Sequence, residues 1–344
     1  MIQANNVMYF KKLNAIGGVE SFIYYLAQKC NDFIFLYGEA DSEQVLRLSK
    51  YIKVRKYKDE KVVCNKFFSN YYPFIIDNVE AKEYIQMIHC DYDNVKFEPI
   101  IHPKFTKYIG VSKYVCDVFT KKTGIKAEVC YNPIVLNIPK IKKTKELTFI
   151  SATRMSSEKG GWRIDKLSEM FDKAGLNYKW YVYTNKGVHF TSPNVIVMEQ
   201  KLDLTKEIAE SSYLVQLSNC EAYCYSVVEA LMLGTPVICT DLPVFKELGI
   251  DDTNSIKVDF NLFNVDIEKI KKGLPKFTYT PPKDNWNKYM GKSNEYNPEE
   301  LVKVKVKRRY TDIALGRKLA RDSIEEMTQQ RASYLEAKEL VECC

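Results

Sequence analysis

The sequence predicts an α/β protein built on parallel sheets, and three observations lead to this prediction. Residues 147–217 alternate between short apolar runs typical of buried strands and segments with helical spacing. At 226–240 a helical segment, a glycine, a proline and another apolar run follow one another, which is half of a Rossmann-like unit. Finally, 344 residues, 46% of them hydrophobic, are enough for the cores of two domains.

The first hundred residues are expected to open with a strand, a glycine loop and a helix. Val7 to Phe10 reads as the strand, and apolar residues follow helical spacing after Gly17 and Gly18. Glycines at this point let backbone N–H groups approach a phosphate or a sugar, although an ordinary strand-to-helix turn would use them equally well. The later expectations are strands at 33–37 and 52–57, a strand or a loop at 67–74, and a helix at 81–87.

The second half begins after a lysine-rich segment at 137–145, which is expected to be a linker. The expected elements are strands at 147–153, 179–184, 195–198, 214–217, 236–240 and 255–260, and helices at 161–174, 204–211, 226–232 and 267–272. Parallel sheets bind ligands beyond the carboxyl ends of their strands. Arg154, the segment 218–221 and Asp241 are all expected at that edge.

The segment from Cys220 to Pro243 joins two glutamates to a helix start. Ser226 is expected to be the N-cap of the helix, and Gly234 ends it. A helix N-terminus carries free N–H groups and positive partial charge, so it favours an anion such as a diphosphate beside Glu221. Glu229, eight residues later, projects from the helix and is expected to have a different role.

Two cations lie around the turn that follows the strand at 147–153. Arg154 and Lys159 flank the sequence MSSEKGG, so both can reach a ligand at the mouth of the sheet. Arginine offers a bidentate fork and lysine a mobile point charge, which together would neutralise a diphosphate. The alternative is that both are solvated surface charges.

These motifs resemble those of family-four retaining glycosyltransferases, nucleotide-sugar enzymes of the two-domain GT-B fold. The likeness rests on the E-x7-E pattern of Glu221 and Glu229 with EALMLGTPVI, and on ATRMSSEKGG at 152–161, AIGGVES at 15–21 and IHCDY at 88–92. It covers roughly the first 260 residues, in the order found in the family. In addition, 105–124 resembles the family's strand ending in Val-Ser with its following helix.

The resemblance implies transfer of a hexosyl group from a nucleoside-diphosphate sugar to an acceptor hydroxyl, with retention and with neither a metal nor a cofactor. It implies that Arg154 and Lys159 stabilise the leaving diphosphate, that Glu221 holds sugar hydroxyls and that Glu229 holds the ribose. Further donor contacts are implied from the other domain and near the base, at the following residues: His89, Gly17, Gly18, Gln200 and Lys201. A lone histidine is otherwise usually structural.

The sequence departs from the family just after the first glutamate. Ala222, Tyr223, Cys224 and Tyr225 stand where the family carries a Gly-aromatic-Gly turn. Close backbone approach to the diphosphate is harder there, so a hydroxyl of Tyr225 or Ser226 is expected to compensate.

The resemblance and the composition divide the chain into four parts. Residues 1–137 are expected to form a Rossmann-like acceptor-side domain and 138–265 a Rossmann-like donor-binding domain. Residues 266–297 are expected to cross back onto the first domain, with Trp286, Tyr289 and Met290 as candidate contacts. Residues 298–344 are expected to be a small appended α+β module.

Composition excludes several classes of protein. The ten cysteines are scattered and mostly lie in apolar runs, which is typical of reduced thiols, and the Cys220–Cys224 pair lacks a second pair for zinc. There is no run of eighteen apolar residues and no signal-peptide pattern, so a cytoplasmic protein is expected. The terminal Cys343 and Cys344 do not fit the prenylation motif. The net charge of +7 permits anionic partners without specifying one.

The tail starts with VKVKVKRRY and ends in a predicted helix carrying Ala332, Leu335 and Leu340 on one side. It resembles, over about 45 residues, a small strand-and-helix domain of phage-associated proteins. The alternating lysines favour a solvated edge strand protected from pairing, and binding of an anion is the alternative. Oligomers formed through this tail and peripheral contact with a membrane are both open.

Other functions compete with glycosyl transfer. Two glutamates also serve glycosidases, but eight helical residues separate Cα atoms by about 12 Å, more than the roughly 5–9.5 Å between hydrolase carboxyls. A phage structural or nucleic-acid-binding protein with a degenerate sugar site is a second alternative. The expected acceptor is a glycan or lipid-linked glycan of bacterial or phage synthesis, followed by protein or hydroxylated bases in DNA.

Overall fold

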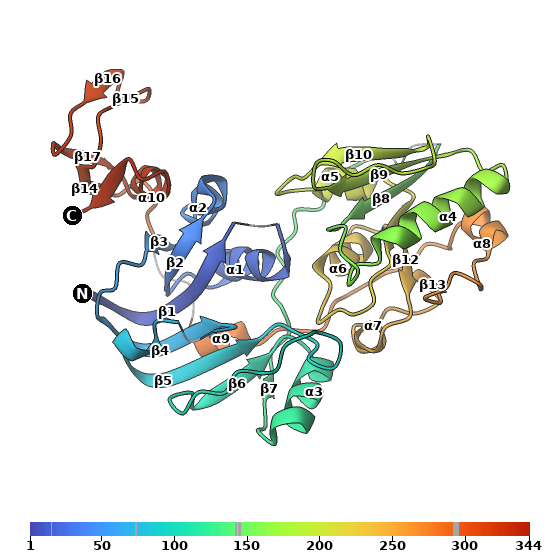
Figure 1. The fold of residues 1–344 in the computed structure, drawn as a ribbon, viewed down its shortest axis with the longest axis horizontal. Helices are drawn as coiled ribbons and strands as arrows, with labels where there is room; N and C mark the ends of the chain where they lie inside the picture. Colours follow the sequence, from blue (N-terminus) through green and yellow to red (C-terminus); the bar gives the residue numbers. More distant parts are fainter. Residues whose placement is uncertain (15, 73, 142, 144–145, 292–295) are drawn as a thin grey trace.

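In the computed structural model, residues 1–344 are described except for 15, 73, 142, 144–145 and 292–295. The chain forms two separate parallel sheets and a small antiparallel tail (Figure 1). The strands of the first sheet, in spatial order, are β3 (Lys53–Lys56), β2 (Ile34–Ala40), β1 (Ile2–Leu13), β4 (Val62–Asn70), β5 (Val79–Ile88), β6 (Lys107–Gly110) and β7 (Glu128–Val129). Those of the second are β10 (Val195–Glu199), β9 (Tyr178–Thr184), β8 (Leu147–Ala152), β11 (Tyr213–Gln216), β12 (Val237–Thr240) and β13 (Ser255–Val258).

Both sheets are doubly wound. The strand order reverses between β1 and β4 in the first sheet and between β8 and β11 in the second. Ligands bind parallel sheets at such reversal points, beyond the carboxyl ends of the strands. The helices of the first sheet are α1 (Gly18–Lys29), α2 (Ser42–Leu48), the 3₁₀ turn η1 (Ile76–Asn78) and α3 (Lys113–Thr123), and those of the second are α4 (Gly161–Lys173), α5 (Thr205–Glu210), α6 (Tyr225–Met232), α7 (Pro243–Glu247) and α8 (Ile267–Lys272).

One predicted element of the first sheet is wrong. The segment 81–87 was expected to be helical, but it lies in β5 and pairs along its length with β4. Its polar first half, which suggested a helix, is partly exposed, whereas Ile85 to Ile88 are buried. Pairing with two neighbouring strands outweighs the local preference.

The chain returns to the first sheet after the second is complete. Helix α9 (Trp286–Met290) lies against α1 and β4, where the ring of Trp286 is 5.0 Å from that of Phe22 and 6.4 Å from that of Phe68. The indole Nε1 of Trp286 donates to the carbonyl of Tyr131 at 3.0 Å. The described residues of the connection from β4 to β5 form only the short turn η1, and α9 covers the face that a crossover helix would otherwise cover.

The tail forms a three-stranded antiparallel sheet, a hairpin and a helix. Its elements are β14 (Leu301–Val306), β15 (Tyr310–Asp312), β16 (Arg317–Leu319), β17 (Ile324–Thr328), α10 (Gln329–Ala337) and β18 (Val341–Cys343). The sheet order is β17-β14-β18, so the lysine-bearing strand β14 is central, and the prediction of an edge strand is wrong. The predicted helix ends at Ala337, which leaves Leu340 outside it.

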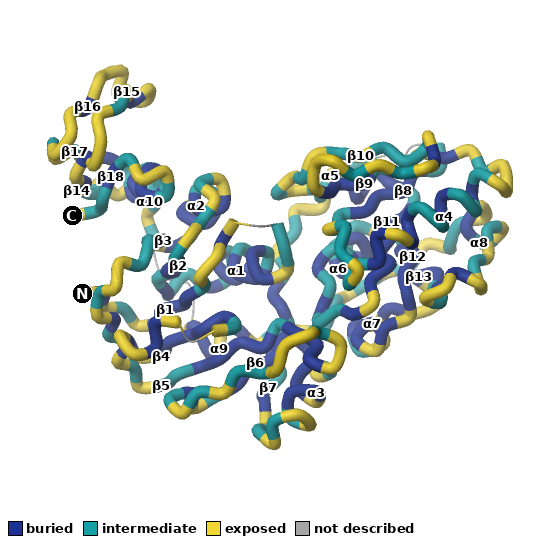
Figure 2. The backbone as a smooth tube through the Cα atoms, in the orientation of Figure 1, coloured by how far each residue is buried: buried dark blue, intermediate teal, exposed yellow. Residues whose placement is uncertain are grey.

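The tail has its own small core but docks on the first sheet. Val304, Met327, Ala332, Leu335 and Val341 form that core. Helix α10 packs against α2 and β3, where the hydroxyl of Ser333 donates to the carbonyl of Val54 at 3.0 Å and Lys58 pairs with the buried Glu336 at 2.9 Å. Figure 2 shows that the β15–β16 hairpin is largely exposed, at the end of the molecule remote from the second sheet. No helix among the described residues is long and apolar enough to cross a membrane.

Candidate active site between the two sheets

A cavity of about 720 Å³ lies between the carboxyl ends of the two sheets. The loops after β1 and β5 line one side of it, and the loops after β8, β10 and β11 line the other. All of the predicted catalytic and donor-binding residues line this one cavity: Gly17, Gly18, His89, Arg154, Lys159, Gln200, Lys201, Glu221, Tyr225, Ser226 and Glu229. Asp241, which was also expected at this edge, does not line it and instead pairs with Lys257 at 2.9 Å.

An ion pair between Lys159 and Glu221 lies at the reversal point of the second sheet. The Nζ of Lys159 is 2.8 Å from Oε1 of Glu221, and both side chains are largely buried. Burial acts to lower the pKa of Lys159, but the Glu221 carboxylate outweighs it and raises that pKa above its usual value. Gly160 fixes the turn, because it has φ +64° and a Cβ there would lie 2.1 Å from the carbonyl oxygen of Leu217.

Two further donors hold the Glu221 carboxylate. The hydroxyl of Ser218 donates to Oε1 at 2.7 Å and the amide of Gln216 donates to it at 3.2 Å. Three donors therefore converge on one oxygen, and Oε2 accepts no hydrogen bond from the residues that the structure describes. The carboxylate is fixed in place with one oxygen available to a ligand.

Arg154 supplies a second positive charge at the mouth of the cavity. Its side chain is exposed, and it forms no salt bridge with any described residue. Lys159 is already paired with Glu221, whereas Arg154 has no such partner among the described residues and is able to pair with an anion. An exposed guanidinium beside a cavity is suited to bidentate binding of a phosphate.

Helix α6 begins in an unusual way. Cys224, and not the predicted Ser226, is the N-cap, and it adopts the left-handed conformation with φ +67°. That region favours glycine, so the chain adopts a glycine-like turn without a glycine, at a cost of about 1–2 kcal/mol. Ser226 lies inside the helix, where its hydroxyl donates to Gln216 Oε1 at 3.3 Å. The hydroxyl of Tyr225 donates to the carbonyl of Pro133 at 3.1 Å, so it is already engaged within the protein.

Glu229 contacts the opposite side of the cavity. The hydroxyl of Tyr25, on α1, donates to Oε1 of Glu229 at 2.8 Å. Burial raises the pKa of the Glu229 carboxyl, although the Tyr25 hydroxyl acts in the other direction. Burial and the charge of Glu229 in turn raise the pKa of Tyr25, so the phenol stays protonated and acts as the donor.

His89 follows β5 and faces the cavity from the first sheet. Its Nε2 is 2.8 Å from Oδ1 of Asn70, and its ring lies 5.0 Å from that of Phe22. Burial lowers the pKa of His89 to about 3, so the imidazole is neutral near pH 7. Because Asn70 Oδ1 can only accept, Nε2 carries the proton and Nδ1 is left as an acceptor.

The remaining predicted residues differ in the open space around them and in whether they already have a partner. A Cβ added at Gly18 would meet nothing within 4 Å, so the start of α1 leaves open space there. At Gly17 it would meet the Glu20 carboxylate at 2.9 Å. Lys201 forms an ion pair at 2.6 Å with Glu207 of α5, on the same side of the cavity. Gln200 precedes Lys201 in the same loop.

Arg47 also lines the cavity, although it was not among the predicted site residues. Its guanidinium lies 3.6 Å from the ring centre of Tyr24, and its Nη1 donates to the carbonyl of Leu202 on the other side of the cavity at 3.1 Å. Arg47 belongs to α2, a helix that was not predicted. The signal was present, because Asp41 is the N-cap, and its carboxylate accepts from the N–H of Glu43 at the start of D-S-E-Q.

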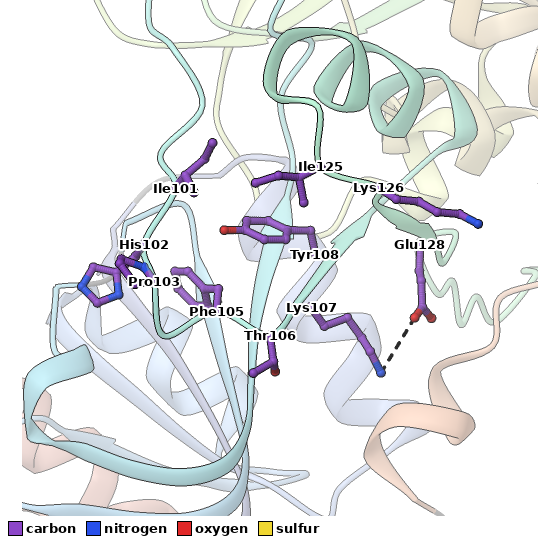
Figure 3. Close-up of a pocket in the computed structure, with 10 residues that line it drawn as sticks. All are labelled: Ile101, His102, Pro103, Phe105, Thr106, Lys107, Tyr108, Ile125, Lys126 and Glu128. Atoms are coloured by element: carbon purple, nitrogen blue, oxygen red, sulfur yellow. Dashed lines mark ion pairs between the residues drawn. The ribbon is translucent and has the colours of Figure 1, made fainter.

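A second hollow of about 330 Å³ lies beside β6 and β7 and contains none of these residues (Figure 3). Its walls mix apolar side chains with the polar side chains of His102, Thr106 and Lys126. Lys107 and Glu128 form an ion pair there at 3.8 Å. Among the described residues, no group of three His, Cys, Asp or Glu side chains is placed to hold a metal ion.

Comparison with known proteins extends this description. No protein-family model and no curated protein matches the sequence. Among solved structures, Anabaena HepE in complex with UDP-glucose is similar over 78% of this chain and 91% of HepE, at 14% identity and a TM-score of 0.60. A glycosyltransferase from Rickettsia africae is similar over 78% of this chain and 88% of its own, at 12% identity and a TM-score of 0.58. Sucrose-phosphate synthase from Thermosynechococcus elongatus is similar over 78% and 90%, at 11% identity and a TM-score of 0.56.

At these identities the likeness shows the fold. Two Rossmann-like units face each other across a cleft, which is the GT-B arrangement, and a small antiparallel tail follows. The predicted fold class is therefore confirmed.

Proposed function

We propose that this chain is a glycosyltransferase that moves a hexosyl group from a nucleoside-diphosphate sugar to an acceptor hydroxyl, with retention and without a metal. One observation carries the proposal. Two segments that follow strands of the second sheet bring four residues to one cavity, which the first sheet closes from the opposite side. These residues are Arg154 and Lys159 after β8, and Glu221 and Glu229 after β11. The GT-B neighbours support it, since one of them, HepE, was crystallised with UDP-glucose.

The donor's nucleotide end is assigned to α6 and the loop after β10. Glu229 would accept hydrogen bonds from the ribose hydroxyls, and the segment 200–201 would contact the base. The first N–H groups of α6 and the exposed guanidinium of Arg154 would bind the diphosphate, because both favour negative charge. Negative charge grows on the leaving diphosphate as the glycosidic bond breaks, so Arg154 would contribute most in the transition state.

The sugar is assigned to the space around Glu221. Oε1 is held by three donors, and Oε2 would accept hydrogen bonds from the sugar hydroxyls. Lys159 fixes this carboxylate and adds positive charge near the diphosphate. His89 is neutral, so its Nδ1 would accept a hydrogen bond from a hydroxyl, and it would not transfer a proton as a cationic acid.

The bond changes are simple. The anomeric carbon loses its bond to the diphosphate oxygen and gains one to the acceptor oxygen, and the acceptor proton leaves with the diphosphate or with solvent. We assign the acceptor to a bacterial or phage glycan or lipid-linked glycan, in a cytoplasmic setting.

Incubation of the full chain with a panel of nucleoside-diphosphate hexoses tests the proposal. Release of nucleoside diphosphate above the level of a Glu221→Gln variant is expected with at least one donor, and the anomer of any product, read by NMR, tests retention. Full activity in EDTA is expected, and loss of activity that Mn²⁺ or Mg²⁺ restores would contradict the metal-free mechanism. If no nucleotide sugar is either hydrolysed or bound, the proposal is wrong.

A further inference from the structure

The net charge of the chain is concentrated in one short segment of the tail. Residues 301–321 contain eight lysines and arginines and a single acidic residue, Asp312. Their net charge of +7 equals that of the whole chain, so the other residues are balanced. The cations are Lys303, Lys305, Lys307, Arg308, Arg309, Arg317, Lys318 and Arg321.

The one carboxylate in this segment is hidden. Asp312 is 1% exposed, pairs with Arg331 on α10, and accepts hydrogen bonds from the hydroxyl of Tyr310 at 3.2 Å and the N–H of Leu315 at 3.0 Å. Every exposed charge between 307 and 321 is therefore positive. Arg317 and Arg321 have acidic neighbours on the following strand and turn, whereas Lys307, Arg309 and Lys318 form no salt bridge with any described residue.

An apolar tip lies between these cations. The turn from β15 to β16 reads Ile-Ala-Leu-Gly at 313–316, where Ile313 is 92% exposed and Leu315 is 40% exposed. Turns normally carry Gly, Asn, Asp or Ser, which solvate well. The hydrogen bond from the N–H of Leu315 to the buried carboxylate of Asp312, together with Gly316 at φ +64°, holds this turn in a fixed shape.

Protection of a sheet edge does not explain the lysines of β14. Strand β14 is the central strand of its sheet, and the β15–β16 hairpin stands apart from the rest of the molecule (Figures 1 and 2). An exposed apolar group rimmed by polar side chains is typical of an interaction surface.

We propose that the β15–β16 hairpin docks this chain on an anionic lipid bilayer. Ile313 and Leu315 enter the apolar boundary, and the surrounding lysines and arginines lie at the level of the anionic headgroups, which is the combination that makes reversible membrane binding stable. A single-stranded nucleic acid is the less suitable partner, because such binding sites use aromatic stacking beside the cations, and the hairpin's one aromatic residue, Tyr310, donates a hydrogen bond to Asp312. The phosphates of a duplex would pair with the cations but would leave Ile313 and Leu315 without an apolar contact. The inference is independent of the proposed catalytic function.

Vesicle flotation of the full chain tests this inference. Binding is expected to vesicles of phosphatidylcholine with about one third phosphatidylglycerol, to be absent with phosphatidylcholine alone, and to weaken as salt is raised. Lys318→Gln is expected to weaken binding about fivefold at low salt. Ile313→Ser is expected to weaken it roughly tenfold, because the side chain loses its apolar contact.

Matched controls lie around the second sheet, at the end of α4 and in the turn after β13. Phe263→Ser removes another exposed apolar side chain, and Lys173→Gln removes another exposed cation, and neither is expected to change vesicle binding. Circular dichroism of Ile313→Ser should match the parent chain, because the side chain has almost no contacts to lose. Equal binding to neutral and anionic vesicles, or binding that Ile313→Ser leaves unchanged, would overturn the proposal. So would absence of vesicle binding together with tight binding of duplex DNA that does not depend on Ile313.

Discussion

The hydroxyl of Tyr25 donates a 2.8 Å hydrogen bond to the carboxylate of Glu229, and the two residues belong to opposite sides of the cavity. In the proposed function Glu229 binds the ribose, so this hydrogen bond competes with the ribose hydroxyls for the carboxylate when a donor enters. We expect Tyr25→Phe to lower the Kd for a nucleoside diphosphate about fivefold, since a net hydrogen bond of about 1 kcal/mol no longer competes. Isothermal titration calorimetry measures the effect, with Tyr24→Phe on the same helix as the control. Weaker binding by Tyr25→Phe would show instead that the hydroxyl contacts the ligand.

Glu229 and Arg154 should separate binding from chemistry. Ribose hydroxyls do not change in the transition state, so Glu229→Ala is expected to raise the donor Kd roughly tenfold or more with a smaller effect on kcat. Arg154→Ala is expected to lower kcat about 100-fold or more with a smaller effect on Kd. Equal losses of kcat in both variants at unchanged Kd, measured by steady-state kinetics and titration, would contradict the assigned roles.

Lys159 and Glu221 should be energetically coupled even without substrate. Lys159→Met leaves the largely buried Glu221 charge without its partner, and Glu221→Gln leaves Lys159 with, among the described residues, only the carboxylate of Glu158, 3.4 Å away. The double variant removes both charges. A double-mutant cycle of urea unfolding is expected to give a coupling of about 1–3 kcal/mol. Additive effects would mean that the ion pair does not form in solution.

The pH dependence of stability should report on His89. Its pKa is about 3 in the folded chain, below the usual value near 6.5, so the unfolded state takes up a proton first as the pH falls. Folding stability is therefore expected to fall as the pH decreases from about 6.5 towards 3, by at most about 1.4 kcal/mol per pH unit from this group. In His89→Gln this part of the slope should disappear. Identical slopes in both chains, from urea unfolding at several pH values, would show that His89 is solvated.

The tail should be separable from donor binding. A chain ending at Asn297 keeps both sheets, α9 and every cavity residue discussed above. Its donor Kd is expected to stay within roughly twofold of the full chain, because none of the described residues that line the cavity belongs to the tail. Its stability is expected to fall, because removal of α10 uncovers α2 and β3 and leaves Lys58 without Glu336. Failure of this chain to fold, seen by circular dichroism, would make the tail part of the catalytic fold.

The convergence of the site was predictable because parallel strands place their carboxyl ends on one edge. Arg154 and Glu221 follow different strands, yet the α/β alternation alone brings them to the same reversal point. His89 was placed correctly at the end of its segment even though that segment was assigned the wrong structure, since a loop residue depends on where an element ends more than on its type.

Contacts between the sheets could not be predicted in this way. The Tyr25–Glu229 bond and the reach of Arg47 to Leu202 depend on how far apart the two layers lie, which no local pattern encodes. The start of α6 was misjudged because Ser226 is the better capping residue by preference, whereas the structure places Cys224 there in a strained conformation. The central position of β14 depends on pairing with residues that lie some 20 and 40 positions away.

The burial of Trp286 against Phe22 and Phe68 has a consequence for how the chain is made. The first sheet emerges from the ribosome early, but the helix that covers it is encoded after the whole second sheet. At 5–20 residues per second, roughly 10–30 s pass between synthesis of β7 and of α9. We expect the nascent first sheet to expose the apolar surface around Phe22 and Phe68 during that interval, until α9 covers it.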